Sequence, residues 1–189
     1  ALTSPLLQKD QDTLVLTPQK PVAAAQIPDA LQSARITGQA AIVYDLTTKE
    51  VLYEKNAKTQ LPLASLTKLI TAYAAAGSLA PNTPVVITET ALKEDGDSGL
   101  TLGERFAFQD LVRFALVSSS NDAAEAIADA AAASEQTSGK NLLASAISAI
   151  GLPQTYALNG TGLDVSDSVS GGYGSAFDVA QLAGALIEK

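Results

Sequence analysis

The sequence contains neither histidine nor cysteine in its 189 residues. Without these side chains it cannot build a Ser-His-Asp or Cys-His catalytic arrangement, the usual zinc site or a disulfide bond. Nucleophilic catalysis would therefore need another base, and a lysine with a depressed pKa can fill that role. The chain offers one such placement, where Lys68 follows Ser65 by three residues.

Other scarcities narrow the class of protein further. No apolar run reaches the roughly 18 residues that a membrane-spanning helix needs. The formal net charge is −8, so no basic face is available for phosphates, and we expect no nucleic-acid partner. Methionine is absent, and we therefore expect that the sequence is not a complete reading frame. Aromatic residues make up only 5%, and the alanine-rich remainder favours closely packed helices.

The composition divides the chain into two parts. Four of the eight prolines lie in residues 1–35, among polar side chains. We interpret this part as an N-terminal extension or linker, with a short helix near residues 29–34, which either packs on the domain or tethers it. Residues 36–189 are interpreted as one folded domain.

Hydrophobic periodicity predicts a β-hairpin followed mainly by helices. Apolar runs at residues 41–44 and 51–53 predict its two strands, and residues 85–87 predict a further extended segment. Helical spacing predicts helices over residues 64–76, 108–117, 123–133, 142–150 and from 176 onward. Four features are predicted to mark helix ends, namely Gly77, an Asp122–Glu125 capping box, Gly151, and Ser175 with Asp178.

Ser65 and Lys68 lie at the start of the first predicted helix. A spacing of three places both side chains on one face, with Cβ atoms ~5–6 Å apart. The backbone N–H groups of a helix N-terminus could stabilise an oxyanion, and the amine of Lys68 could accept the serine proton. Burial or a neighbouring cation would have to lower the lysine pKa. The tetrapeptide alone equally fits an ordinary helix start with an exposed lysine.

A second polar cluster, residues 119–121, interrupts the helices. The hydroxyl of Ser119 could pass on a proton, and the amide of Asn121 could hold a peptide bond, because it both donates and accepts. The alternative is that these are ordinary cap and turn residues at a helix junction.

Taken together, these segments resemble a known family. Residues 61–71 closely resemble the active-site segment of the serine D-alanyl-D-alanine carboxypeptidases, the low-molecular-weight penicillin-binding proteins. Residues 119–124 resemble their second motif, and residues 159–163 resemble their Asn-x-x-Gly-Leu segment. The resemblance extends over residues 36–189. It implies an α/β fold of the penicillin-binding protein/β-lactamase type, of which this chain holds mainly the helical part and the first hairpin.

The resemblance also implies an activity. Ser65 would be the acylated nucleophile, Lys68 the general base, Ser119 the proton relay and Asn121 the group that binds the substrate amide. The reaction would remove the terminal D-alanine of a peptidoglycan stem peptide outside the cytoplasm, in the periplasm or cell-wall space. β-Lactam antibiotics would acylate Ser65 as covalent inhibitors. Neither a cofactor nor a metal ion is implied, and the choice between carboxypeptidase and endopeptidase action stays open.

The sequence departs from the family pattern at one motif. The family's Lys-Thr-Gly triplet, expected on a strand after the last helix, does not occur before the chain stops at Lys189. It would lie downstream, in a separate chain, or not exist. The family often uses a C-terminal anchor, and the resemblance implies that such an anchor would also lie beyond Lys189. The 189 residues alone are expected to be nearly inactive, since losing one oxyanion donor costs about 10²–10³-fold.

Two alternatives follow from the same pattern. A domain that lacks the third motif could be a non-catalytic module that binds peptidoglycan or a protein partner. Fast β-lactam hydrolysis of the class A type is not expected, because that chemistry uses a glutamate-bearing loop and residues 152–164 contain no glutamate.

Overall fold

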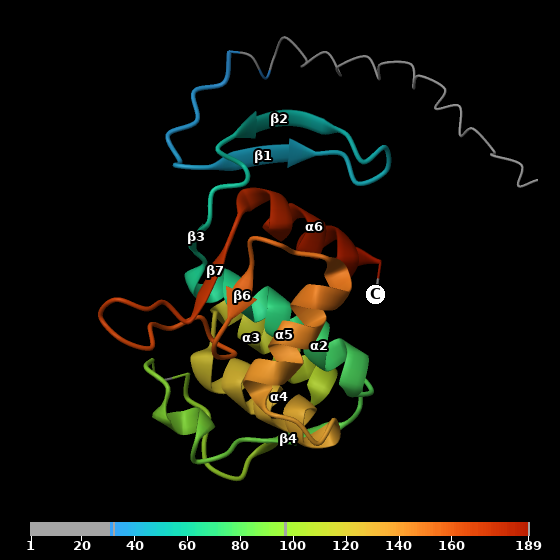
Figure 1. The fold of residues 1–189 in the computed structure, drawn as a ribbon. Coiled ribbons are helices and arrows are strands. Elements are labelled where there is room, and N and C mark those ends of the chain that lie inside the picture. The colour runs from blue at the N-terminus through green and yellow to red at the C-terminus, as the bar shows by residue number, and fades with distance from the viewer. Residues whose placement is uncertain (1–30, 32, 97, 189) are drawn as a thin grey trace, which may run out of the picture.

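The structure, a computed structural model, describes residues 31, 33–96 and 98–188 (Figure 1). Most of the extension in residues 1–35, and most of the short helix predicted near residues 29–34, therefore lie outside the described residues. Helices form the body of the molecule, and a two-stranded hairpin lies at one end (Figure 1). The predicted order, a hairpin followed mostly by helices, is confirmed.

The strands form three small antiparallel sheets. The predicted hairpin is present as β1 (Ala41–Tyr44) and β2 (Val51–Lys55). The other sheets are β3 (Leu61–Pro62), β7 (Gly172–Gly174) and β6 (Tyr156–Ala157) in that spatial order, and β4 (Pro84–Val86) with β5 (Arg105–Ala107). Of these, only β4 corresponds to a predicted segment. Strands of two or three residues are too short to show the alternation by which strands are predicted.

Five α-helices in the described part of the chain match the predicted ones to within a few residues. They are α2 (Thr67–Ser78), α3 (Phe108–Ser118), α4 (Asn121–Ser134), α5 (Gly139–Ile150) and α6 (Ala176–Ile187). Two short 3₁₀ turns, η1 (Ala64–Leu66) and η2 (Ala91–Lys93), precede α2 and the polar loop that follows β4. None of these helices is both long and apolar enough to cross a bilayer.

Two predicted helix ends are confirmed and two are wrong. Gly151 ends α5 in the left-handed conformation (φ 80°), and the Ser175 side chain caps α6. Gly77 does not end α2, which continues to Ser78, because Gly77 keeps a helical backbone rather than a positive φ. The cap of α4 is Ser120 rather than Asp122, since the Ser120 hydroxyl accepts from the N–H of Ala123 at 3.0 Å.

The hydrophobic core lies among the helices. Large side chains from the five α-helices are almost fully buried in it: Ile70, Leu111, Ile127, Leu143 and Leu182. Alanines dominate the buried face of α4, which lets it pack closely against α2 and α3. The sequence prediction of closely packed, alanine-rich helices is therefore confirmed.

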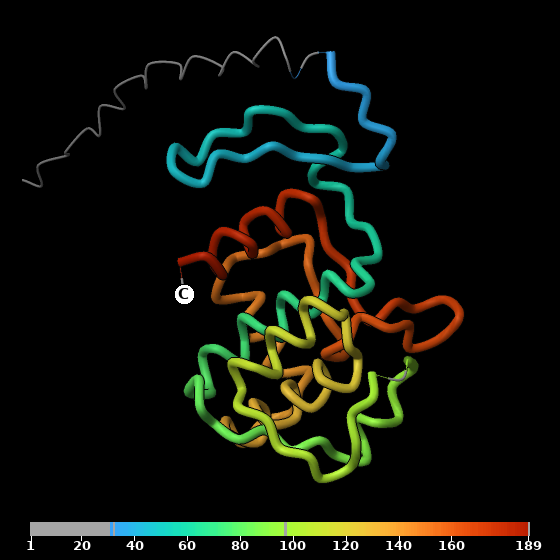
Figure 2. Tube along the Cα trace, turned by 180° about the vertical axis from the view of Figure 1, so that it is seen from behind, coloured from blue at the N-terminus to red at the C-terminus, as the bar shows by residue number. Residues whose placement is uncertain are grey.

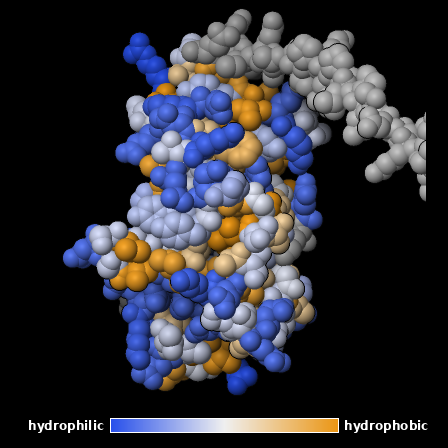
Figure 3. Space-filling model, in the orientation of Figure 1, coloured by the Kyte–Doolittle hydropathy of each residue, from blue (hydrophilic) through white to orange (hydrophobic). Residues whose placement is uncertain are grey.

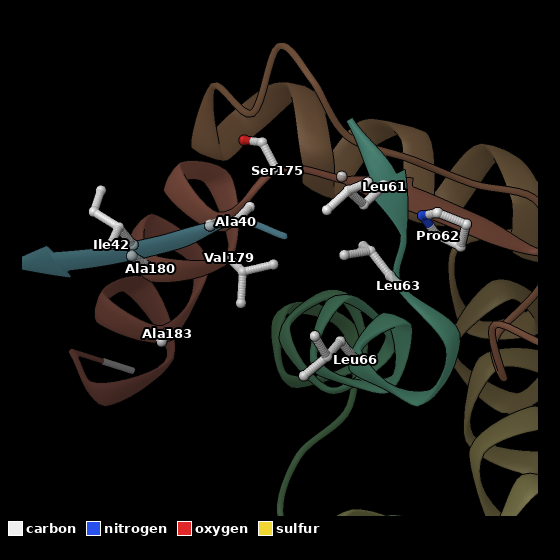
Figure 4. Close-up of a pocket in the computed structure, with 12 residues that line it drawn as sticks. Ala40, Ile42, Leu61, Pro62, Leu63, Leu66, Ser175, Val179, Ala180 and Ala183 are labelled. Carbon is white, nitrogen blue, oxygen red and sulfur yellow. The ribbon is translucent and has the colours of Figure 1, made fainter. Parts of the chain in front are cut away.

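Helix α6 lies between the helical body and the hairpin (Figures 1 and 2). An apolar groove of about 410 Å³ runs between β1, β3 and α6. Ile42, Leu61, Leu66 and Val179 are among the side chains around it (Figure 4). Hydrophobic residues also interrupt the hydrophilic surface between the hairpin and the body (Figure 3). The hairpin is therefore only partly covered by the described residues.

Candidate active site

Ser65 is positioned by strand pairing. In the β3–β7 pair Pro62 lies opposite Tyr173, and the N–H of Leu63 then donates to the carbonyl of Gly172 at 2.9 Å. Ala64 turns the chain with a positive φ of 46°, so that Ser65 lies exposed in the 3₁₀ turn η1. The first turn of the helix predicted from residue 64 is thus 3₁₀, and the α-helix begins at Thr67.

Lys68 is buried directly beneath this serine. Its side chain is only 2% exposed. The Nζ atom donates to Ser65 Oγ at 2.8 Å, to Asn121 Oδ1 at 2.7 Å and to the carbonyl of Thr161 at 3.3 Å. Burial lowers the pKa of Lys68, while the negative charge of Glu94 raises it. The sequence suggested burial or a neighbouring cation as the cause of a lowered pKa. Burial is the cause here, and the charge that acts on Lys68, that of Glu94, is negative and opposes it.

Ser119 lies between α3 and α4, at the end of α3. Its backbone is left-handed (φ 58°, ψ 29°), which costs about 1–2 kcal/mol for a residue other than glycine. In this conformation its hydroxyl donates to Ser65 Oγ at 2.9 Å. The Oγ atom of Ser65 therefore has an amine on one side and a second hydroxyl on the other.

Asn121 is the first residue of α4 and uses both ends of its amide. Its Oδ1 accepts from Lys68 Nζ, and its Nδ2 donates to the carbonyl of Asp95. The side chain thus orients the lysine and ties it to the loop after η2. The predicted contact with a substrate amide would use the remaining capacity of this side chain. Oδ1 has a second lone pair to accept with, and Nδ2 has a second N–H to donate.

Residues 159–163 form a wall of the site to which sequence analysis gave no role. The Asn159 amide accepts from the N–H of Gly162 at 2.8 Å and donates to the carbonyl of Leu163 at 2.9 Å. This turn presents the Thr161 carbonyl to Lys68. A Cβ atom on Gly162 would lie 2.0 Å from the carbonyl oxygen of Ala64. The two glycines in this short segment, Gly160 and Gly162, are the sequence feature that could have predicted a tight turn with another backbone segment close to it.

Two glutamates from elsewhere in the chain contact this wall. Glu94 Oε2 accepts from the Thr161 hydroxyl at 3.3 Å, and Glu125 Oε2 accepts from the N–H of Gly160 at 3.2 Å. Burial raises the pKa of Glu125, and the charges of Asp129 and Glu94 raise it further. Residues 152–164 do lack glutamate, as noted from the sequence, but the fold brings these carboxylates to them from the η2 loop and from α4.

The site opens into a pocket of about 380 Å³. Its lining comprises Ser65, Lys68, Ser119 and four leucines, Leu63, Leu66, Leu69 and Leu116. The described residues contain no group of three or more acidic side chains arranged to hold a metal ion. The arrangement is that of a serine flanked by a buried lysine and a second serine, beside an apolar pocket.

Comparison with known proteins shows the family to which the chain belongs. The family described as D-alanyl-D-alanine carboxypeptidase, peptidase S11, matches residues 25–189. The chain belongs to this family. It is 33% identical over 154 residues to the D-alanyl-D-alanine endopeptidase of Pseudomonas aeruginosa, covering 76% of this chain and 48% of that protein. It is 32% identical over 178 residues to the carboxypeptidase DacD of Salmonella typhimurium, covering 88% and 44%.

Solved structures of the family confirm the predicted fold class. The carboxypeptidase DacD of Francisella tularensis superposes with a TM-score of 0.71 at 30% identity, covering 82% of this chain and 38% of that one. Penicillin-binding protein D2 of Listeria monocytogenes, in its ampicillin-bound form, gives 0.68 at 26%, covering 82% and 63%. The chain spans about half the length of the curated relatives it matches.

Proposed function

We propose that the protein is a serine-type D-alanyl-D-alanine carboxypeptidase that removes the terminal D-alanine from peptidoglycan stem peptides through an acyl-enzyme. One observation carries the proposal: Ser65 Oγ lies 2.8 Å from Lys68 Nζ and 2.9 Å from Ser119 Oγ. The names of the carboxypeptidase and endopeptidase relatives support the substrate class. Such a substrate places the protein outside the cytoplasm, in the periplasm or cell-wall space.

In the first step the lysine acts as the base. Burial lowers the pKa of Lys68, which favours the neutral amine. The neutral Nζ takes the proton of Ser65, and Oγ forms a bond to the carbonyl carbon of the penultimate D-alanine. The negative charge of the tetrahedral intermediate resides on the former carbonyl oxygen, which backbone N–H donors would stabilise.

In the second step the leaving amine receives a proton. Ser119 lies on the other side of Ser65 Oγ, and its hydroxyl passes a proton to the nitrogen of the departing D-alanine as the peptide bond breaks. Lys68 is the source of that proton, because it holds the one removed from Ser65. Asn121 would bind the substrate amide and at the same time keep the Lys68 amine oriented toward Ser65.

The resulting ester on Ser65 is then hydrolysed by water, which releases the shortened peptide and restores the hydroxyl. β-Lactams would enter the same sequence as substrate mimics, with the amide of the four-membered ring in place of the peptide bond. Listeria penicillin-binding protein D2, which shares the fold, has been solved in ampicillin-bound and cefotaxime-bound forms. We therefore propose β-lactams as covalent inhibitors of this protein.

Labelling with a fluorescent penicillin tests the proposal. The full-length gene product containing this chain should become covalently labelled, and Ser65→Ala should abolish the label. Ser119→Ala should slow labelling by about 10²-fold or more, as expected for loss of a proton-transfer group. Ser118→Ala is the matched control, because that exposed hydroxyl donates to the carbonyl of Phe114 and does not contact Ser65.

The same experiment tests the alternative of a non-catalytic binding module. A folded protein that shows no Ser65-dependent label, and that releases no D-alanine from a peptide ending in D-Ala-D-Ala, would refute the catalytic proposal. Retained binding of peptidoglycan by that protein would then identify a non-catalytic binding module.

A further inference from the structure

Glu94 touches the catalytic cluster without belonging to it. It follows η2 directly and is half-buried. Its Oε2 atom lies 3.3 Å from the Thr161 hydroxyl, which shares its one proton between Glu94 and Asn159 Oδ1 at 3.2 Å. The backbone carbonyl of Thr161 accepts from Lys68 Nζ. The carbonyl of the next residue, Asp95, accepts from the amide of Asn121, the other polar partner of the lysine. The loop after η2 therefore contacts two of the three groups that hold the Lys68 amine.

We propose that Glu94 is a positioning residue for Lys68, which holds the Thr161 carbonyl against the amine and adds a carboxylate to the segment that binds it. The inference deepens the proposed function and rests on Lys68 as the base. Glu94 itself contacts neither Ser65 nor the pocket beside it in the described structure.

Glu94 differs from the other charged groups near α2 in its effect on Lys68. Among the residues that the structure describes, the charge that acts on the pKa of Lys68 is that of Glu94, and it raises that pKa against the effect of burial. In the described part of the loop and on the helices packed against α2, the other charged residues are Asp95, Glu104, Asp110, Arg113, Asp122, Glu125, Asp129, Lys140 and Asp178. Two carboxylates of α4 accept from backbone N–H groups instead, Asp122 from Ser98 and Glu125 from Gly160.

The two opposing effects set the pH range in which the base can work. Burial favours the neutral amine, which can accept the Ser65 proton, whereas Glu94 favours the ammonium. A base is most effective when its pKa lies near the working pH. An amine subject to burial alone would be neutral but weakly basic. Removing the charge of Glu94 should therefore shift the acid limb of the acylation profile to lower pH.

The variant Glu94→Gln in the full-length protein tests this, because glutamine keeps an oxygen that can accept from Thr161. The titration of Lys68 is followed by NMR of its labelled ε-carbon, and acylation by fluorescent penicillin is followed as a function of pH. We expect Lys68 to lose its proton at lower pH than in the wild type. Acylation on the acid limb should become roughly threefold to tenfold faster, the size expected for one nearby charge.

Matched variants separate charge from geometry. Glu104→Gln removes an equal charge from an exposed carboxylate that accepts from the N–H of Thr101, and it should leave both readouts unchanged. Glu94→Asp keeps the charge and should titrate closer to the wild type than Glu94→Gln does. Thr161→Val keeps the charge of Glu94 but removes the linking hydroxyl, and it should slow acylation across the pH range.

The outcomes are distinguishable from those of the proposed function. An unchanged Lys68 titration in folded Glu94→Gln would overturn the inference, as would an equal shift in Glu104→Gln. If Glu94→Gln fails to fold, an undiminished acylation rate in Thr161→Val, together with an acid limb strongly shifted in Glu94→Asp although the charge is kept, would overturn it as well. A shifted titration in a protein that no penicillin labels would support the role of Glu94 and refute the carboxypeptidase proposal instead.

Discussion

The surroundings of α2 and the hairpin side of the molecule are built in different ways. Beside α2, polar groups are buried and paired: Lys68 and Thr71 are each 2% exposed, and the Thr71 hydroxyl donates to the carbonyl of Gly160 at 2.7 Å. In the hairpin, no residue of β1 or β2 is fully buried. An edge-to-face contact between Tyr44 and Phe177 and the apolar groove mark its junction with α6.

This contrast shows where the chemistry is specified. An unpaired buried polar group costs free energy, so a buried network holds one geometry. The site draws on η1, α2, α4 and the 159–163 turn, which belong to that network. The hairpin contributes none of the site residues named above. Changes near α2 should therefore affect both activity and stability strongly, and changes in the hairpin should affect them weakly.

The largest difference is expected for the same lysine substitution in the two regions. Lys68→Met replaces the buried amine by an apolar chain of similar length, and it should reduce penicillin acylation by roughly 10³-fold or more through loss of the base. Lys58→Met removes an exposed lysine whose ammonium lies 5.7 Å from the ring centre of Phe177, and it should change the rate little. Comparable rates in the two folded variants would contradict the assignment of Lys68 as base.

The close approach of two backbones beside the site predicts the next largest effect. Gly162 and Gly151 both have a positive φ, 82° and 80°. Gly151→Ala meets open space and should cost about 1–2 kcal/mol from backbone strain alone. Gly162→Ala also places a Cβ atom 2.0 Å from the Ala64 carbonyl and should cost ~3 kcal/mol or more. Urea unfolding measures both, and equal losses would show that the approach at Gly162 relaxes freely.

Core packing predicts a further difference between the two regions. Ile70 of α2 is completely buried, whereas Ile42 of β1 is half-buried beside the groove. Ile70→Ala should destabilise by about 2–5 kcal/mol through lost burial and a cavity. Ile42→Ala should cost roughly 1 kcal/mol, because solvent already reaches the site. Denaturant titration of both variants tests this, and a larger loss for Ile42 would show the hairpin to be as well packed as the helices.

The same contrast explains what could be predicted from the sequence. Periodicity predicted the helices and the hairpin, and the spacing of Ser65 and Lys68 placed the two side chains together, because both are local patterns. Ser119 and Asn121 formed a polar cluster that equally fitted ordinary cap and turn residues, and only the family resemblance favoured a catalytic role. The contacts of Glu94, Glu125 and the Thr161 carbonyl join segments that are 35 to 93 positions apart in the chain. Nothing in local sequence encodes such pairings, so only the tertiary structure reveals them.

The smallest effects concern pH, where one carboxylate from each region should act with opposite sign. Backbone hydrogen bonds from Thr48 and Thr47 lower the pKa of Asp45, so its contribution to stability exists above its unfolded-state pKa and is lost as pH falls through the folded-state pKa. Burial raises the pKa of Glu125. Its folded form holds the proton more tightly, and this contribution is lost as pH rises through the raised pKa.

Glu125→Gln should therefore remove a loss of stability that occurs as pH rises from the ordinary glutamate pKa through the raised one. Asp45→Asn should instead remove a loss that occurs as pH falls below the ordinary aspartate pKa. Urea midpoints for wild type and both variants, measured from acidic to neutral pH, give the two slopes. A slope of the same sign at the two sites would mean that burial beside α2 does not penalise the Glu125 charge, and the contrast between the regions would then not extend to their electrostatics.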